Sequence, residues 1–223
     1  MRKPVIDYRE FRLSKLNTPQ FSHLKLLLGW AVYFLLYFVT ENFIPATKCA
    51  PMHMWLDDVI PFREEFVIAY TFWYVLIVIS LVYFALYNIE SFKKLQTFII
   101  WTQVIAMVAY IIYPSRQDLR PLEYPRDNFL TDIVALIQTV DTPTGVCPSL
   151  HVAYSIGIGS VWLKEKGVNP WWKAFVVFSV IMISLSTMFV KQHSAVDVLW
   201  ALPMCAVIEL VLYRKRYFGR WMK

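Results

Sequence analysis

Long apolar runs separated by short polar segments dominate the pattern along this chain. A helix that spans a membrane needs roughly 20 mostly apolar residues to cross a hydrocarbon layer about 30 Å thick. The fourth run is the weakest, because Lys164, Glu165 and Lys166 end it early. The pattern predicts an all-α polytopic membrane protein, with residues 1–223 forming one domain. The six predicted spans lie at about 24–44, 66–89, 96–113, 149–164, 170–190 and 194–213.

Two segments between the spans are long enough to carry structure of their own. The longer one covers about 114–148, and Leu130, Ile133, Val134 and Ile137 share one face of a predicted amphipathic helix inside it. We expect this helix to lie along the membrane interface. The other segment follows the first span, from Pro45 to about residue 65, and its stretch 57–62 predicts a short structured lid. Long loops in compact domains are usually functional.

The composition supports the membrane interpretation. Hydrophobic residues make up 58% of the chain and aromatic residues 17%, which is more apolar surface than the core of a soluble domain of this length absorbs. The first apolar run has no small-residue cleavage pattern after it, so we expect a retained span rather than a signal peptide.

The formal net charge of +6 follows the predicted topology rather than a nucleic-acid interface. Most of the acids in the loops fall on the opposite side of the six-span topology, where they include Asp57, Asp58, Glu64, Glu65, Asp118, Asp127 and Asp141. The positive-inside rule then places both termini in the cytoplasm. Sixteen of the 22 basic residues share that side: Arg2, Lys3, Arg9, Arg12, Lys15, Lys25, Lys93, Lys94, Lys164, Lys166, Lys173, Arg214, Lys215, Arg216, Arg220 and Lys223.

Two of the four histidines lie at positions that suggest a catalytic role. His23 and His53 have simpler interpretations, at the edge of the first span and on the surface of a loop. His151 begins the fourth span and His193 begins the sixth, so both face the outer side of the membrane. Asp197 follows His193 by four residues, which places the two side chains on one helical face. An acid just inside a span needs a partner, and a His–Asp pair fixes the tautomer of the imidazole and raises its basicity.

Basic side chains at the same face predict an anionic ligand. Arg116, Arg120 and Lys191 lie there without enough acids to neutralise all three. Helix N-termini bind anions through their free amide groups, and Pro148 stands at one such start. Cations, histidines and amides together favour a phosphate. The inventory requires no metal and no cofactor.

These residues fall into a known arrangement. Arg120-Pro121, then Pro148-Ser149-Leu150-His151, then Ser186 through His193 to Asp197 resemble the signature of the type 2 phosphatidic acid phosphatase (PAP2) superfamily. That signature reads Lys-x6-Arg-Pro, Pro-Ser-Gly-His and Ser-Arg-x5-His-x3-Asp. The resemblance covers about 113–201 and implies a six-helix bundle, in agreement with the span count.

Three positions depart from the signature. Tyr113, Leu150 and Thr187 stand where the superfamily has Lys, Gly and Arg. Such relaxed versions resemble the divergent branch that includes the inositol phosphorylceramide and sphingomyelin synthases. Lys191 would supply the cation that Thr187 lacks. The departures leave open the substrate and the choice between hydrolysis and transfer.

The resemblance implies a mechanism and a substrate class. His193 would attack the phosphorus of a lipid phosphate and form a phosphohistidine, while Asp197 orients it. His151 would protonate the leaving alcohol and later activate water or an acceptor hydroxyl. The remaining role, holding the phosphate oxygens, would fall to Arg120, Lys191 and Ser149, with Arg116 as a weaker candidate. We expect hydrolysis of a lipid phosphomonoester or pyrophosphate at the outer membrane face, with membrane lipids as the partners.

Several alternatives remain open at this stage. His151, His193 and Asp197 are also ligand types that suit zinc, although the nearby cations would repel it. A lipid-binding or transport protein with a weakened signature is a non-enzyme alternative, and transfer to a second alcohol is an enzymatic one. Cys49 and Cys147 fall in outer loops, so a disulfide and two free thiols are both compatible with the sequence.

Overall fold

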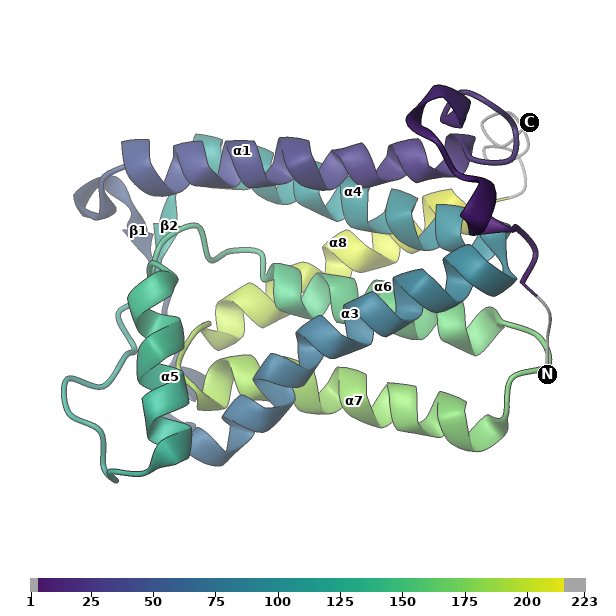
Figure 1. Cartoon of the computed structure of the whole chain (residues 1–223). Helices are drawn as coiled ribbons and strands as arrows, with labels where there is room; N and C mark the ends of the chain where they lie inside the picture. The colour runs from purple at the N-terminus through teal and green to yellow at the C-terminus, as the bar shows by residue number, and fades with distance from the viewer. Residues whose placement is uncertain (1–3, 215–223) are drawn as a thin grey trace.

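The computed structural model describes residues 4–214, and the regular structure in this part of the chain is almost all helical (Figure 1). Six of the basic residues behind the predicted orientation lie outside the described range: Arg2, Lys3, Lys215, Arg216, Arg220 and Lys223. The helices are α1 (Leu28–Phe43), α2 (Trp55–Val59), α3 (Val67–Tyr87), α4 (Ile89–Ile112), α5 (Phe129–Val140), α6 (Leu150–Lys164), α7 (Pro170–Phe189) and α8 (Ala195–Tyr213). The strands β1 (Ala50–Pro51) and β2 (Ser115–Arg116) form a short parallel pair.

Five helical segments are long and apolar enough to cross a membrane. The predicted all-α membrane class is therefore confirmed, whereas the sixth span is not. The exception is α6, whose 15 residues reach about 22 Å at 1.5 Å per residue, short of the roughly 30 Å hydrocarbon layer. The five segments are Ser22–Phe43, Glu64–Tyr87, Ile89–Ile112, Pro170–Phe189 and Ala195–Tyr213, and the first two include the 3₁₀ turns Ser22–Leu27 and Glu64–Phe66.

The helix that contains the predicted third span begins before residue 96. Helix α4 begins at Ile89, because the side chain of Asn88 caps it by accepting from the amide of Ser91. Lys93 and Lys94, which the sequence placed between spans, lie inside this helix. Lys94 pairs with Glu90 at 2.6 Å, one turn earlier, so its charge does not stand alone at the helix end.

Helix α6 is the short helix that the other helices surround. Ten of its fifteen residues are buried, and it packs against α3, α4, α7 and α8 (Figure 1). Trp162 donates from Nε1 to the hydroxyl of Ser80 on α3 at 2.9 Å, so its buried polar atom is satisfied. A helix enclosed in this way contacts protein rather than lipid over most of its length, and this relaxes the length requirement of a lipid-facing span.

The predicted amphipathic helix is confirmed as α5. Asn128 caps it by accepting from the amides of Leu130 and Thr131, and Val134 turns inward against Val67 and Tyr70. Helix α5 crosses one end of the bundle, beside β1 and β2, while the N-terminal segment and the end of α8 lie at the opposite end (Figure 1). The predicted site residues gather near the α5 end.

Helix α1 stands at the side of the bundle. Among the long helices it packs chiefly against α4 (Figure 1). Much of its surface faces outward, with Val32, Leu35 and Phe38 among its exposed residues. Because α1 is held from one side, a space opens between it and α3.

The close packing of Gly157 against Phe98 predicts a stability defect. A Cβ atom built on Gly157 of α6 would lie 2.5 Å from Cδ1 of Phe98 on α4, and Phe98 is itself buried. We expect Gly157→Leu to lower the free energy of unfolding by about 1–3 kcal/mol, because the packed core has no space for the added side chain. Thermal unfolding in detergent measures this. Val207→Leu on the exposed face of α8 is the control and should leave the melting temperature unchanged; an unchanged value for Gly157→Leu would contradict the packing.

Candidate active site

The His193–Asp197 pair predicted from the sequence is present at the start of α8. Ser194 is the N-cap, and the buried Asp197 accepts on Oδ2 from the amide of Ser194 at 2.9 Å and from Nδ1 of His193 at 3.2 Å. The four-residue spacing brings the two side chains together because one helical turn separates them. With Nδ1 donating to the carboxylate, Nε2 of His193 carries the lone pair.

His151 lies beside His193 in the first turn of α6. The two ring centroids are 5.8 Å apart, and Tyr70 and Trp73 of α3 contact the His151 ring at 4.5 and 4.1 Å between centroids. The Nε2 atom of His151 is buried and has no hydrogen-bond partner among the described residues. The amide of Ser149 donates to the backbone oxygen of Asp197 at 3.1 Å, so the starts of α6 and α8 are joined directly.

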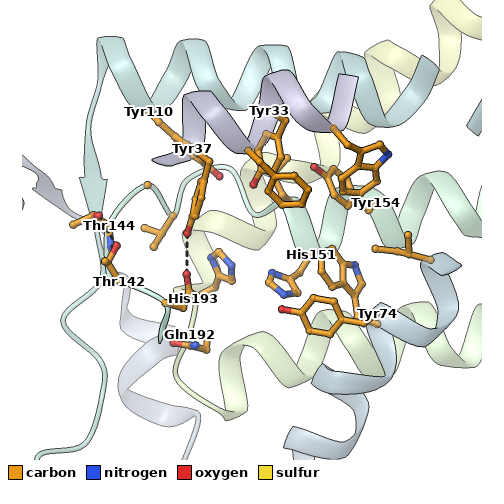
Figure 2. Close-up of a pocket in the computed structure, with 18 of the residues that line it drawn as sticks. Tyr33, Tyr37, Tyr74, Tyr110, Thr142, Thr144, His151, Tyr154, Gln192 and His193 are labelled. Atoms are coloured by element: carbon orange, nitrogen blue, oxygen red, sulfur yellow. Dashed lines mark hydrogen bonds between the residues drawn. The ribbon is translucent and has the colours of Figure 1, made fainter. Parts of the chain in front are cut away.

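Both histidines line a cavity of about 570 Å³ between α1, α3 and α6 (Figure 2). Its wall follows α1 from Leu27 to Tyr37, which corresponds to about 15 Å of helix at 1.5 Å per residue. Several wall residues are also exposed on the outside of the bundle, among them Phe34, Tyr74 and Val78, so the cavity opens sideways between α1 and α3. It is a slot with an aromatic and aliphatic wall and two histidines at one end.

A polar rim closes the histidine end of this slot. Tyr37 donates from its hydroxyl to Asp141 at 2.8 Å, and Figure 2 shows the Tyr37 side chain reaching down toward His193. Next to it, Thr142 donates to Glu41, and Thr142 and Thr144 share a hydrogen bond of 2.8 Å. The carboxylates of this rim were not identified as site residues from the sequence, since α1 and the segment after α5 meet only in the folded chain.

None of the three predicted phosphate-binding cations lines the cavity, and two of them are bonded elsewhere in the protein. Lys191 donates from Nζ to the backbone oxygens of Asp57 at 2.9 Å and Ile60 at 2.5 Å, and burial lowers the pKa of its ammonium group. Arg116 pairs with Asp118 at 3.1 Å and donates to the backbone oxygen of Cys49 at 3.0 Å. The expected convergence of three cations on one site is therefore absent from the described residues, because backbone oxygens and an acid engage two of them.

Arg120 and Ser149 lie close to the site without lining the cavity. Arg120 donates from Nη1 to the backbone oxygen of Gln138 at 2.8 Å, and partial burial lowers the pKa of its guanidinium group. Gln138 in turn donates from Nε2 to the backbone oxygen of Val190 at 3.1 Å, which connects Arg120 to the loop before His193. Ser149 is the N-cap of α6; its hydroxyl is fully buried, makes no capping bond and has no partner among the described residues.

Asp57 is a site residue that sequence reasoning missed. Its buried carboxylate accepts from the hydroxyl of Ser194 at 2.5 Å and from the amide of Ala195 at 2.8 Å. The amides at the start of α8 are thus bonded to protein acceptors, and the N-terminus of α8 does not offer them to an anion as the sequence suggested. The signal for Asp57 was its place in the predicted lid at 57–62, but nothing in the sequence indicated its partner 137 residues away.

The structure also bears on the disulfide and metal alternatives. Cys49 and Cys147 are free, so the disulfide alternative is not formed. Within residues 4–214, no three His, Cys, Asp or Glu side chains gather as the ligands of a metal ion do.

Comparisons with protein-family models, curated proteins and solved structures find no match to this chain.

The surroundings of Cys147 predict low thiol reactivity. Burial and the nearby charge of Asp197 raise the pKa of Cys147 to about 12, so the thiol stays protonated at pH 8. Because the thiolate is the reactive form, we expect maleimide to label Cys147 at least about a hundredfold more slowly than a thiol with a pKa of about 8.5. Timed labelling of the native protein followed by peptide mass spectrometry measures this, with Leu122→Cys as the exposed reference.

The same experiment tests the free thiols. After unfolding without reductant, both Cys49 and Cys147 should take up the label. Fast labelling of native Cys147 would contradict its burial beside Asp197, and two unlabelled thiols after unfolding would indicate a disulfide.

Proposed function

We propose that this chain is a membrane enzyme that breaks the phosphate ester bond of a lipid through a phosphohistidine at His193. The observation that carries the proposal is the slot that joins two histidines to a long apolar wall open at its side. A soluble metabolite has no long apolar part to bury against a wall of about 15 Å, whereas the tail of a lipid can fill this space. The phosphate of the same molecule then lies against His151 and His193.

His193 is the nucleophile. Asp197 accepts from Nδ1, which keeps the proton on that nitrogen and leaves the Nε2 lone pair for attack on phosphorus. The new P–N bond replaces the P–O bond to the lipid alcohol. The buried carboxylate also stabilises the positive charge that the ring acquires as the bond forms.

His151 is the general acid and base. Its Nε2 has no hydrogen-bond partner among the described residues, as expected of a group that exchanges a proton with substrate. It protonates the leaving oxygen, and then removes a proton from the water that attacks the phosphohistidine and breaks the P–N bond. The two rings are neighbours, with centroids 5.8 Å apart, so both histidines can reach the same phosphate.

The charge of the phosphate is held chiefly by groups at the start of α6. Ser149 offers a hydroxyl without a partner, and the first-turn amides carry the partial positive charge of a helix N-terminus. Arg120 adds a cation tied to the same region through Gln138. Lys191 and Arg116 instead hold the surrounding loops, so their role is positioning.

The proposal includes an orientation in the membrane. The histidine end of the bundle faces the outside, and the opposite end, with the N-terminal segment and the end of α8, faces the cytoplasm. Basic residues on the N-terminal segment, including Arg9, Arg12 and Lys15, support this direction. Water reaches the phosphohistidine from the outer side, and a second alcohol that arrives by the same route would make the enzyme a phosphotransferase.

The first test compares wild type with His193→Ala in detergent, on a panel of lipid phosphates with EDTA present. We expect turnover to fall by about a thousandfold or more in the variant, because no other group forms the covalent intermediate. His53→Ala is the matched control: this histidine is exposed, pairs with Asp58 and lies outside the cavity. Its turnover should equal that of wild type.

Three outcomes decide the proposal. Loss of turnover in a His193→Ala protein that melts at the wild-type temperature supports it. Unchanged turnover in that variant rules out His193 as the nucleophile. Activity that disappears from wild type with EDTA would favour a metal-dependent hydrolase.

A further inference from the structure

A second cavity lies at the end of the bundle opposite the histidines. It has a volume of about 660 Å³ and is formed by the ends of α3 and α6, the start of α7 and the turn between α6 and α7. Figure 1 shows this turn at the end of the bundle away from α5. On α3 the wall runs from Ile79 to Tyr87, about 12 Å of helix at 1.5 Å per residue. We call this cavity the turn groove; it shares no lining residue with the slot.

Aromatic rings line the turn groove. The buried ring of Trp162 on α6 has its centroid 4.6 Å from that of Tyr83 and 5.3 Å from that of Trp172. Tyr83 in turn lies 5.0 Å from Tyr87, at the end of α3. Tyrosine and tryptophan gather where a bilayer meets water, because they combine an apolar ring with a polar O–H or N–H group. This composition is typical of the level at which lipid headgroups lie.

The turn beside the groove is basic. Lys166 is exposed and directly precedes Gly167 of the groove wall, while Lys173 directly follows Trp172. Lys173 donates from Nζ to the backbone oxygen of Leu163 at 2.8 Å rather than to an acid, so this contact does not neutralise its charge. Two ammonium groups therefore adjoin the groove wall in the chain.

The acids of this region are engaged elsewhere. Glu165 ends α6, and its Oε2 accepts from Asn88 and from Ser91, each at 2.8 Å, at the start of α4. Glu209 on α8 pairs with Lys164. Within residues 4–214, no Asp or Glu lines the groove. The groove thus combines an apolar wall with a positive rim.

Asn169 adds a neutral hydrogen-bond donor to this rim. Its Oδ1 accepts from the amide of Trp171 at 2.9 Å and caps α7. The side chain is exposed on the groove wall, and its Nδ2 makes no hydrogen bond to another residue in the part of the chain that the structure describes. An amide N–H beside ammonium groups is suited to the oxygens of a phosphate.

We propose that the turn groove binds an anionic phospholipid of the bilayer leaflet at this end of the bundle. Lys166, Lys173 and Asn169 bind the phosphate, and an acyl chain lies along the aromatic rings toward Ile79. A zwitterionic lipid carries an ammonium group that the lysines repel, so the groove prefers a headgroup with a net negative charge. In the proposed orientation this leaflet is the cytoplasmic one, but the site does not depend on the chemistry at His193.

Native mass spectrometry of delipidated protein tests this, with phosphatidylglycerol and phosphatidylcholine of identical acyl chains as probes. We expect wild type to bind the first phosphatidylglycerol at least about fivefold more tightly than the first phosphatidylcholine. Lys166→Gln should weaken the binding of phosphatidylglycerol by about fivefold and change that of phosphatidylcholine by less than about twofold. The matched control is Lys15→Gln, which removes the same charge from an exposed residue at the same end but outside the groove, and should bind both lipids as wild type does.

A second pair of variants separates the groove from the slot. The neighbouring residues Ile79 and Val78 are both exposed on α3, but Ile79 lines the groove and Val78 lines the slot. Ile79→Trp should abolish the preference for phosphatidylglycerol, because the larger side chain fills the space of the acyl chain. Val78→Trp should keep the preference. The melting temperature of each variant in the same detergent checks that it is folded.

The outcomes are distinct from those of the proposed function. Equal binding of the two lipids by wild type overturns the inference, as does an equal effect of Lys166→Gln and Lys15→Gln. Loss of the preference in Val78→Trp instead of Ile79→Trp would place the lipid in the slot and would also overturn it. If Ile79→Trp melts at a lower temperature than wild type, Lys166→Gln decides, because it changes only an exposed side chain. His193→Ala should bind phosphatidylglycerol as wild type does, so either proposal can fail while the other stands.

Discussion

Asp197 has no exposed surface, yet it lies in the first turn of a helix that is long and apolar enough to span a membrane. An unpaired carboxylate in such a place costs several kcal/mol, so the chain must supply it with donors. The amide of Ser194 and the ring of His193 supply donors to one of its two oxygens, Oδ2. The same residue's backbone oxygen accepts from Ser149 and joins α6 to α8. The orientation of His193 and its distance from His151 both follow from how this one charge is accommodated.

A second buried acid extends the arrangement to the loops at this end of the bundle. Asp57 bonds to Ser194 and Ala195, while Lys191 bonds to the backbone oxygens of Asp57 and Ile60. The loop after α1 and the loop before α8 therefore hold each other by reciprocal contacts. These contacts use the amides of α8 and the ammonium of Lys191. In the proposed function, this leaves the phosphate to the start of α6 and to Arg120, a weaker set than the sequence suggested.

The position of α1 gives one cavity both a polar end and an apolar wall. Because α1 packs chiefly against α4, its other side and α3 form the walls of a slot. The tyrosines of α1 and α3 place hydroxyl groups near the rim, and Tyr37 binds Asp141 there. Toward the other end the wall becomes aliphatic, with Leu27 and Leu81. A molecule with a charged head and a long tail matches this gradient along its length.

The sequence alone determined the helical membrane class, the amphipathic helix of α5 and the pairing of His193 with Asp197. Each of these depends on residues close in sequence, where helical periodicity and spacing fix the geometry. The tertiary structure alone decided which distant groups meet. It brought Asp57 to α8, enclosed α6 within the bundle, and placed Asp141 on the cavity wall while Lys191 bonded to backbone oxygens. Contacts between loops far apart in the chain depend on how the helices pack, and the apolar pattern of a single helix does not record which neighbour it will have.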